Sequence, residues 1–84
     1  MMPIHELLNR IRWDKEFGRG RIEIGFFDRR ENTIHSVALK EVLFPAGERR
    51  VFEMLDESGK PRRIPFHRIR EVYRDGRIIW KRPG

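Results

Sequence analysis

The sequence predicts a single α+β domain, residues 1–84, in which one N-terminal helix precedes a curled antiparallel sheet of five or six short strands. Three observations predict it. A chain of 84 residues is too short for two hydrophobic cores. Its first residues repeat with the period of a helix, and the remainder alternates like strands separated by glycine, proline and polar turns. A small, partly open barrel is one arrangement that such strands adopt.

The helix is expected over residues 3–12. Four apolar residues recur at the i, i+3, i+4, i+7 spacing that places side chains on one helix face: Ile4, Leu7, Leu8 and Ile11. Pro3 suits a first helical turn, and two glycines follow shortly after the expected end. This segment is therefore predicted to cover the sheet with its apolar face.

The strands are expected over residues 21–28, 34–39, 50–56, 61–65, 69–74 and 77–82. In the first, Ile22, Ile24 and Phe26 alternate with other side chains, which is the period of a strand with one apolar face. Residues 40–44 are expected to be irregular or helical. The prolines that bound residues 61–65 suit an edge strand. The patterns do not indicate the order of the strands.

The last two strands are predicted to form a tight hairpin at Asp75-Gly76, because a type I′ turn needs positive φ at both central positions. The expected register pairs Tyr73 with Ile78, Val72 with Ile79, and Arg74 with Arg77. Like charges directly across a ladder are unfavourable. The two arginines are therefore expected to point into water or to share an anion.

The positive charge is concentrated at the end of the chain. Residues 60–84 hold nine basic and two acidic residues, whereas residues 1–59 hold ten basic and eleven acidic residues. Of the 19 basic residues 15 are arginine, whose planar group binds phosphate oxygens in pairs. Aromatic residues are interleaved with this basic segment, which favours nucleic acid as the partner. The alternative is a solvated basic surface, adapted to heat or protected against aggregation.

The composition excludes several kinds of chemistry. Without cysteine there is no disulfide, thiolate metal site or cysteine nucleophile. His5, His35 and His67 are far apart and have no ligand spacing, so neither a metal nor another cofactor is expected. No glycine-rich phosphate loop or Ser-His-Asp order is present. The apolar runs are too short for a membrane span and the N-terminus lacks signal-peptide features, so a cytoplasmic protein without a membrane partner is expected.

His67 and Arg68 are the best single candidates for a ligand contact. They lie in a connector after Pro65, at the start of the most basic stretch. The structural alternative is that His67 binds a buried carbonyl and Arg68 pairs with Asp14 or Asp28.

Four short motifs follow one another along almost the whole chain. They are Arg12-Trp13-Asp14, Gly25-Phe26-Phe27-Asp28-Arg29, Pro65-Phe66-His67-Arg68-Ile69 and Trp80-Lys81-Arg82. They resemble the patterns Ile/Val-x-Trp-Asp, Gly-Tyr-x-Asp-Arg, Pro-x-His-Arg-Ile and Trp-x-Arg of a family of small proteins, the RNA cyclic-group-end recognition domain. Phe26 stands where that family usually has tyrosine, so a hydrogen bond from that phenol is absent here.

The resemblance implies a partner and a set of residues. The family's domain, stand-alone in archaea, is fused in eukaryotes to two-histidine phosphoesterases and other RNA-processing enzymes. It is predicted to bind RNA ends that carry a 2′,3′-cyclic phosphate. The resemblance therefore implies RNA, and RNA-processing enzymes, as partners. Position by position it marks Trp13, Asp14, Asp28, Arg29, His67, Arg68, Trp80 and Arg82.

A cyclic phosphate is a compact monoanion without a free terminal hydroxyl, so its site needs a forked cation, an imidazole donor and a surface for the last base. We expect Arg68 or Arg29 to be the fork, His67 the donor, and Trp13 or Tyr73 the stacking surface. Asp14 and Asp28 would orient the arginines, while Phe26 and Trp80 are assigned to packing first. The full expected RNA-binding set is His67, Arg68, Arg29, Trp13, Arg82, Tyr73, Arg70, Arg74 and Arg77.

The expected function is therefore a non-enzymatic RNA-binding module that recognises processed RNA ends. One rival is an enzyme in which His67 acts with His35 or His5 on a cyclic phosphate. Neither His35 nor His67 is followed two places later by a hydroxyl residue, as a two-histidine phosphoesterase requires. The other rival is a protein-interaction domain with an exposed sheet edge, whose binding would show little salt dependence.

Overall fold

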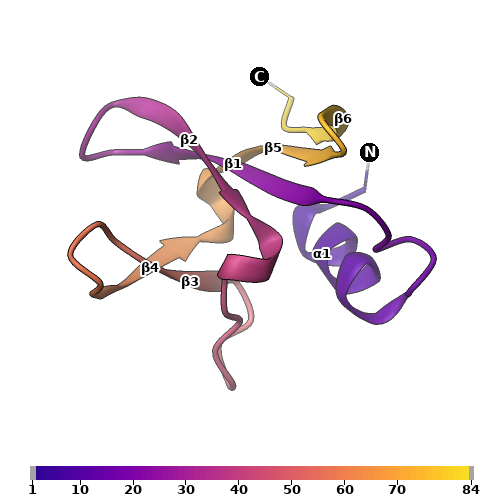
Figure 1. The fold of residues 1–84 in the computed structure, drawn as a ribbon, viewed down its shortest axis with the longest axis horizontal. Coiled ribbons are helices and arrows are strands. Elements are labelled where there is room, and N and C mark those ends of the chain that lie inside the picture. Colours follow the sequence, from indigo (N-terminus) through magenta and orange to yellow (C-terminus); the bar gives the residue numbers. More distant parts are fainter. Residues whose placement is uncertain (1, 84) are drawn as a thin grey trace.

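The computed structural model describes residues 2–83. In that range a single α-helix, α1 (Ile4–Trp13), precedes six antiparallel strands and two short 3-10 turns (Figure 1). The strands are β1 (Ile22–Asp28), β2 (Thr33–Ala38), β3 (Val51–Leu55), β4 (Pro61–Pro65), β5 (Ile69–Arg74) and β6 (Arg77–Lys81), and the turns are η1 (Leu39–Glu41) and η2 (Phe66–Arg68). The predicted helix and all six predicted strands are confirmed, with every boundary within one residue.

The strands form two sheets instead of one curled sheet. One sheet has the order β2-β1-β5-β6, and β3 pairs with β4 in a separate hairpin. Prolines occupy both ends of β4, where they remove backbone donors, and η2 turns the chain before β5 begins. The α+β class is confirmed, and the described strands close no barrel.

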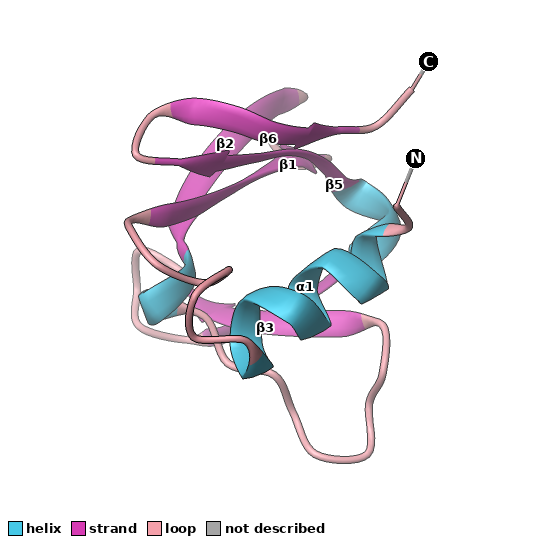
Figure 2. Cartoon of the chain, turned by 90° about the vertical axis from the view of Figure 1, so that its right-hand side faces the viewer, coloured by secondary structure: helices cyan, strands magenta, loops and turns pink. Residues whose placement is uncertain are grey.

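One core lies between the four-stranded sheet, the β3–β4 hairpin and α1, which Figure 2 shows as the upper layer, the lower layer and the helix between them. The predicted apolar face of α1 is buried throughout. Phe26 of the sheet meets Phe52 of the hairpin edge-to-face, with ring centroids 5.9 Å apart. Phe26 and Trp80 are both buried, which confirms their assignment to packing. No described helix has both the length and the apolar character needed to cross a membrane.

The β5–β6 turn has the predicted geometry. Asp75 has φ 49° and Gly76 has φ 83°, the two positive values that a type I′ turn needs. The expected pairs Tyr73–Ile78 and Arg74–Arg77 are present. Val72, however, pairs with Trp80 instead of Ile79, because a bulge between Val72 and Tyr73 shifts the register. The shift sets Trp80 opposite a core residue, and its ring is buried.

Candidate functional site

Two arginines hold the η2 turn, and Ile69 directly after it, by their carbonyl oxygens. Arg82 donates from Nε to the carbonyl of Ile69 at 2.8 Å and from Nη2 to that of Phe66 at 3.1 Å. Arg70 donates from Nη1 to the carbonyl of His67 at 3.2 Å. Hydrogen bonds from charged donors are stronger than neutral ones. Two of the sequence motifs therefore meet here, and the position of His67 is set by both arginines.

The η2 turn forms one wall of an open cleft of about 470 Å³ beside the N-terminal end of α1, which we call the histidine cleft. The Phe66 N–H donates to the carbonyl of Arg50 at 2.8 Å, which joins the segment before β3 to this turn. The indole of Trp80 donates to the carbonyl of Met2 at 2.7 Å and holds the N-terminal segment at the rim. The basic side chains that line it are His5, Arg50, His67 and Arg82, and none of its described lining residues is acidic.

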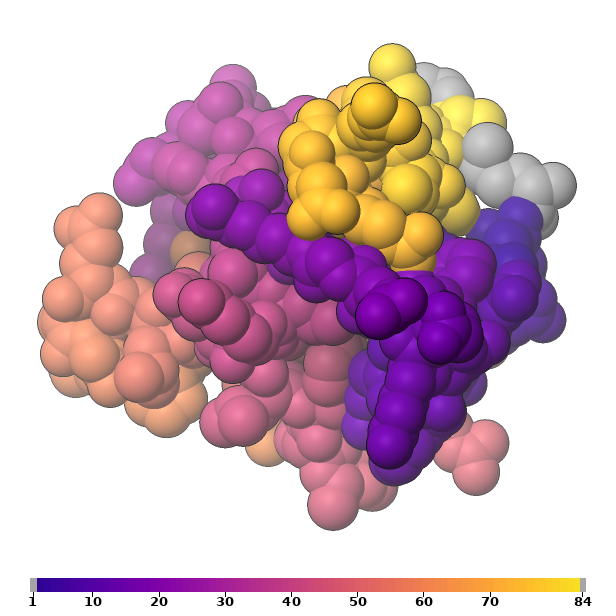
Figure 3. Space-filling model, turned by 45° about the vertical axis from the view of Figure 1, so that its right-hand side comes forward, coloured from indigo at the N-terminus to yellow at the C-terminus, as the bar shows by residue number. Residues whose placement is uncertain are grey.

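A second cleft of about 500 Å³, the arginine cleft, continues along α1. It shares His5, Arg50 and Phe66 with the histidine cleft, so the two adjoin. Arg12 and Arg49 add further positive charge from opposite walls. Figure 3 shows α1, in indigo and purple, with the pink segment of residues 39–50 emerging beneath and beside it.

The predicted RNA-binding residues do not all meet. His67 and Arg82 line the histidine cleft. Arg68 is part-buried and is not among the residues that line it. Arg29 is exposed in the β1–β2 turn, on the other side of the molecule from α1 (Figure 1).

Two predicted residues of the β5–β6 hairpin make contacts within the fold. The hydroxyl of Tyr73 donates to Glu71 Oε1 at 2.7 Å, and this bond to the carboxylate raises the pKa of Tyr73. The Cζ of Arg74 lies 5.1 Å from the ring centroid of Phe17, and its Nε and Nη2 are buried without a hydrogen-bond partner among the described residues. Arg77 is exposed. The two opposed arginines therefore do not both point into water, since Arg77 is exposed and Arg74 is part-buried.

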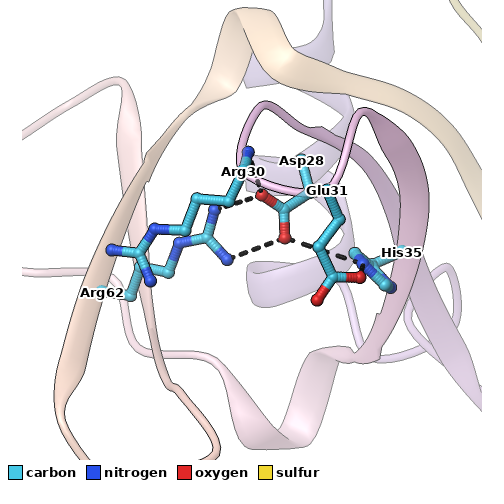
Figure 4. A network of polar contacts seen from close by, with 5 residues as sticks. All are labelled: Asp28, Arg30, Glu31, His35 and Arg62. Atoms are coloured by element: carbon cyan, nitrogen blue, oxygen red, sulfur yellow. Dashed lines mark hydrogen bonds and ion pairs between the residues drawn. The ribbon is translucent and has the colours of Figure 1, made fainter.

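Asp28 orients an arginine, but that arginine is Arg62, which was not among the predicted residues (Figure 4). Asp28 Oδ1 lies 2.6 Å from Arg62 Nη2, and Oδ2 lies 3.0 Å from Nη1. The forked bond from Arg62 holds the pKa of the buried Asp28 carboxyl well below its usual range, and a bond from the Arg30 N–H lowers it further. His35 Nε2 completes the network, 2.8 Å from Glu31 and 3.7 Å from Asp28.

This network links the end of β1 to the β3–β4 hairpin. One ligand atom each from Asp28, Glu31 and His35 lies within 4.8 Å of the others, close enough to reach one metal ion. Both oxygens of Asp28 accept hydrogen bonds from Arg62, and Glu31 lies against His35, so the contacts within this group neutralise its charge. The role that the geometry supports is structural.

Asp14 contacts backbone instead of an arginine. Its Oδ1 accepts hydrogen bonds from the N–H groups of Glu16 and Phe17 at 3.1 and 3.2 Å, directly after α1 ends. These bonds satisfy backbone N–H donors in the turn that leads from the helix to β1. Trp13, the preceding residue, is 76% exposed.

The predicted RNA-binding set omits four of the six basic residues that line the two clefts. His5, Arg12, Arg49 and Arg50 belong to the first 59 residues, whose charges nearly cancel along the chain. A helical projection could have found one pair, because His5 and Arg12 are seven residues apart and share one face of α1. The adjacent Arg49-Arg50, directly before a strand, was the other available indication.

Comparison with known proteins agrees with the four motifs. The chain matches the MJ1316 RNA cyclic group end recognition domain over residues 1–82. No curated protein and no solved structure matches it. Because the match covers nearly the whole chain, the chain belongs to the family of the MJ1316 RNA cyclic group end recognition domain.

Proposed function

We propose that the protein binds RNA ends and that its histidine cleft accepts a terminal 2′,3′-cyclic phosphate without hydrolysing it. The observation that carries the proposal is the meeting of His5, Arg50, His67 and Arg82 around one cleft that has no acidic residue among its described lining. A compact monoanion needs hydrogen-bond donors and positive charge without a competing carboxylate.

The lining residues suit different parts of such an end. No described carboxylate lies within ion-pair distance of Arg50, so its forked donors are available for the two non-bridging oxygens. An imidazole N–H from His5 or His67 is suited to a ring oxygen. Two donors of Arg82 are committed to backbone carbonyls, so Arg82 contributes charge and holds the turn in place. The rings of Phe66 and Trp80 offer apolar contact to the ribose.

Fluorescence-anisotropy titrations test the proposal with short single-stranded RNAs that differ only at the 3′ end: cyclic phosphate, linear 3′-phosphate and free hydroxyl, each at two salt concentrations. We expect the cyclic end to bind most tightly, with affinity falling as salt rises. His67→Ala and Arg50→Gln should each weaken its binding by about 10- to 100-fold, as expected for a lost hydrogen bond to a charged group.

Arg29→Gln is the matched control. It removes the same charge as Arg50→Gln, and Arg29 is exposed in the β1–β2 turn, which lies across the molecule from α1 in Figure 1. The cleft assignment predicts at most a small, salt-dependent loss for this variant. Equal binding of all three ends, or a larger loss for Arg29→Gln than for Arg50→Gln, would overturn the assignment. Absence of RNA binding at any salt would favour the protein-interaction domain.

One observation favours a second candidate, a cyclic phosphodiesterase. His5 and His67 line the same cleft, whereas His35 belongs to the Asp28 network. In that reaction one imidazole takes a proton from water as it attacks phosphorus, and the other protonates the 2′-oxygen as its bond to phosphorus breaks, leaving a 3′-phosphate. Incubation of the cyclic-ended RNA with the protein, followed by mass spectrometry, separates the two functions, because hydrolysis adds one water to the RNA.

A further inference from the structure

We propose that the RNA strand behind the bound end runs along α1 and stacks a base on Trp13, so that the ligand is a single-stranded 3′ tail and a blunt duplex end is excluded. The inference rests on the proposed function for the position of the terminal phosphate. It extends that function to the nucleotides that precede the end.

Three clefts follow one another along the helix. The histidine and arginine clefts share His5, Arg50 and Phe66. The arginine cleft in turn shares Arg12 and Phe44 with a third cleft of about 710 Å³, the tryptophan cleft, at the C-terminal end of α1. At 1.5 Å per residue, His5 and Arg12 are about 10 Å apart along one helix face. The shared residues make the three clefts one continuous track.

The track is positively charged along its length. Arg12, Arg49 and Lys40 line it, and no described carboxylate lies within ion-pair distance of any of them. Among the described lining residues of the three clefts, Glu48 alone is acidic, and its Oε1 already accepts a 2.6 Å hydrogen bond from Arg63. Successive cations on both walls suit the phosphates of a strand.

The far end of the track carries an aromatic surface that the fold leaves in water. Trp13 is 76% exposed, although large aromatic rings in small domains usually pack in the core. The Cζ of Arg12 lies 5.2 Å from the centroid of Trp13 and 4.3 Å from that of Phe44, so one guanidinium joins the two rings. An unpaired base can stack on such a ring, whereas a duplex keeps its bases stacked within the helix.

The test uses 5′-labelled strands of two, four and eight nucleotides that end in a 2′,3′-cyclic phosphate, and the eight-nucleotide strand annealed to a blunt-ended complement. Uridine 2′,3′-cyclic phosphate serves as an unlabelled competitor that reports on the terminal site alone. We expect affinity to rise with length and then level off, and the blunt duplex to bind more weakly than the single strand.

Trp13→Ala should lower affinity for the eight-nucleotide strand by about 5- to 150-fold, the contribution of one stacked base. It should leave competition by uridine 2′,3′-cyclic phosphate unchanged. Trp13→Phe should retain most of the affinity because it keeps a ring. Leu43→Ala is the matched control, since Leu43 is also apolar and exposed but lines none of the three clefts. Because Trp13 is exposed, neither Trp13→Ala nor Trp13→Phe removes core packing.

Affinity independent of length, an unchanged Trp13→Ala variant, or equal binding of the blunt duplex would overturn the strand path while leaving end recognition intact. An equal effect of Trp13→Ala on the mononucleotide would also overturn it, because Trp13 would then contact the terminal nucleotide. If the mononucleotide failed to compete while long strands with any 3′ end bound through Trp13, end recognition would fail and the path would stand.

Discussion

Replacing Arg62 by methionine should destabilise the fold by about 3 kcal/mol. The side chains of Asp28 and Arg62 are 5% and 15% exposed, and they share two hydrogen bonds of 2.6 and 3.0 Å. Removing one member of a buried ion pair costs roughly 3–5 kcal/mol, because the other charge stays buried without a partner. The partial exposure of Arg62 favours the lower end of that range. Methionine keeps much of the apolar stem, so the loss reports mainly on the charge.

Urea and thermal unfolding at pH 7, followed by circular dichroism, measure this loss. A domain of this size shifts its Tm by about 4–8 °C per kcal/mol, so we expect a decrease of about 12–24 °C. Arg63→Met is the matched control. Arg63 is the next residue and pairs with two carboxylates, but its side chain is 57% exposed, and surface pairs contribute about 0–1 kcal/mol.

The same pair predicts a dependence on acid. The pKa of Asp28 is depressed in the folded protein, chiefly by the forked bond from Arg62. The contribution of the ionised Asp28 to the free energy of unfolding is therefore complete above the unfolded carboxyl pKa of about 3.9, and it is lost as pH falls below that value. In Arg62→Met this loss of stability at acid pH should largely disappear, because the bond that lowers the Asp28 pKa is gone. The reasoning is refuted if Arg62→Met costs no more than Arg63→Met, or if the acid dependence of the variant matches that of the parent.

Three further predictions concern the turn that carries the candidate site and the two structures beside it. Arg82→Lys should weaken binding of cyclic-ended RNA about tenfold, because lysine lacks the fork that donates to the carbonyls of both Phe66 and Ile69. Hydrogen exchange at the η2 turn should accelerate in this variant, and unchanged exchange would contradict the prediction. Trp80→Phe should lower the free energy of unfolding by about 1 kcal/mol in urea, because the ring stays buried while the indole donor to Met2 is lost. Gly76→Ala should cost about 1–2 kcal/mol in the same titration, because alanine is strained at φ 83°, and a neutral result would argue against the type I′ turn.

The candidate site was predictable only in part. His67 and Arg82 were identified because each belongs to a short motif, and the fold brings them to one cleft. Arg50 was missed because its place in the cleft depends on a contact between distant segments. Its carbonyl accepts a hydrogen bond from the N–H of Phe66, and the sequence around Arg50 does not indicate that contact. Asp28 was predicted to orient an arginine, but its partner is 34 residues away in a separate hairpin, and a local pattern does not indicate such a contact.

The basic C-terminal segment illustrates the same limit. Its net charge favours an anionic partner, yet Arg62 and Arg63 of that segment are paired with carboxylates from earlier in the chain. The candidate clefts draw Arg12, Arg49 and Arg50 from a segment whose charges nearly cancel. The residues that form the positive surface of the clefts are therefore not mainly those of the positively charged C-terminal segment.

The sequence by itself determined the helix, the six strands and the type I′ turn, because each depends on side-chain period and backbone preferences over a few neighbouring residues. The tertiary structure alone decided that the strands divide into two sheets, which arginines are neutralised, and which cations line the clefts beside α1. The physical reason is that charge interactions fall off with distance in space, within about 10 Å in salt, and residues far apart in the chain come that close only after folding.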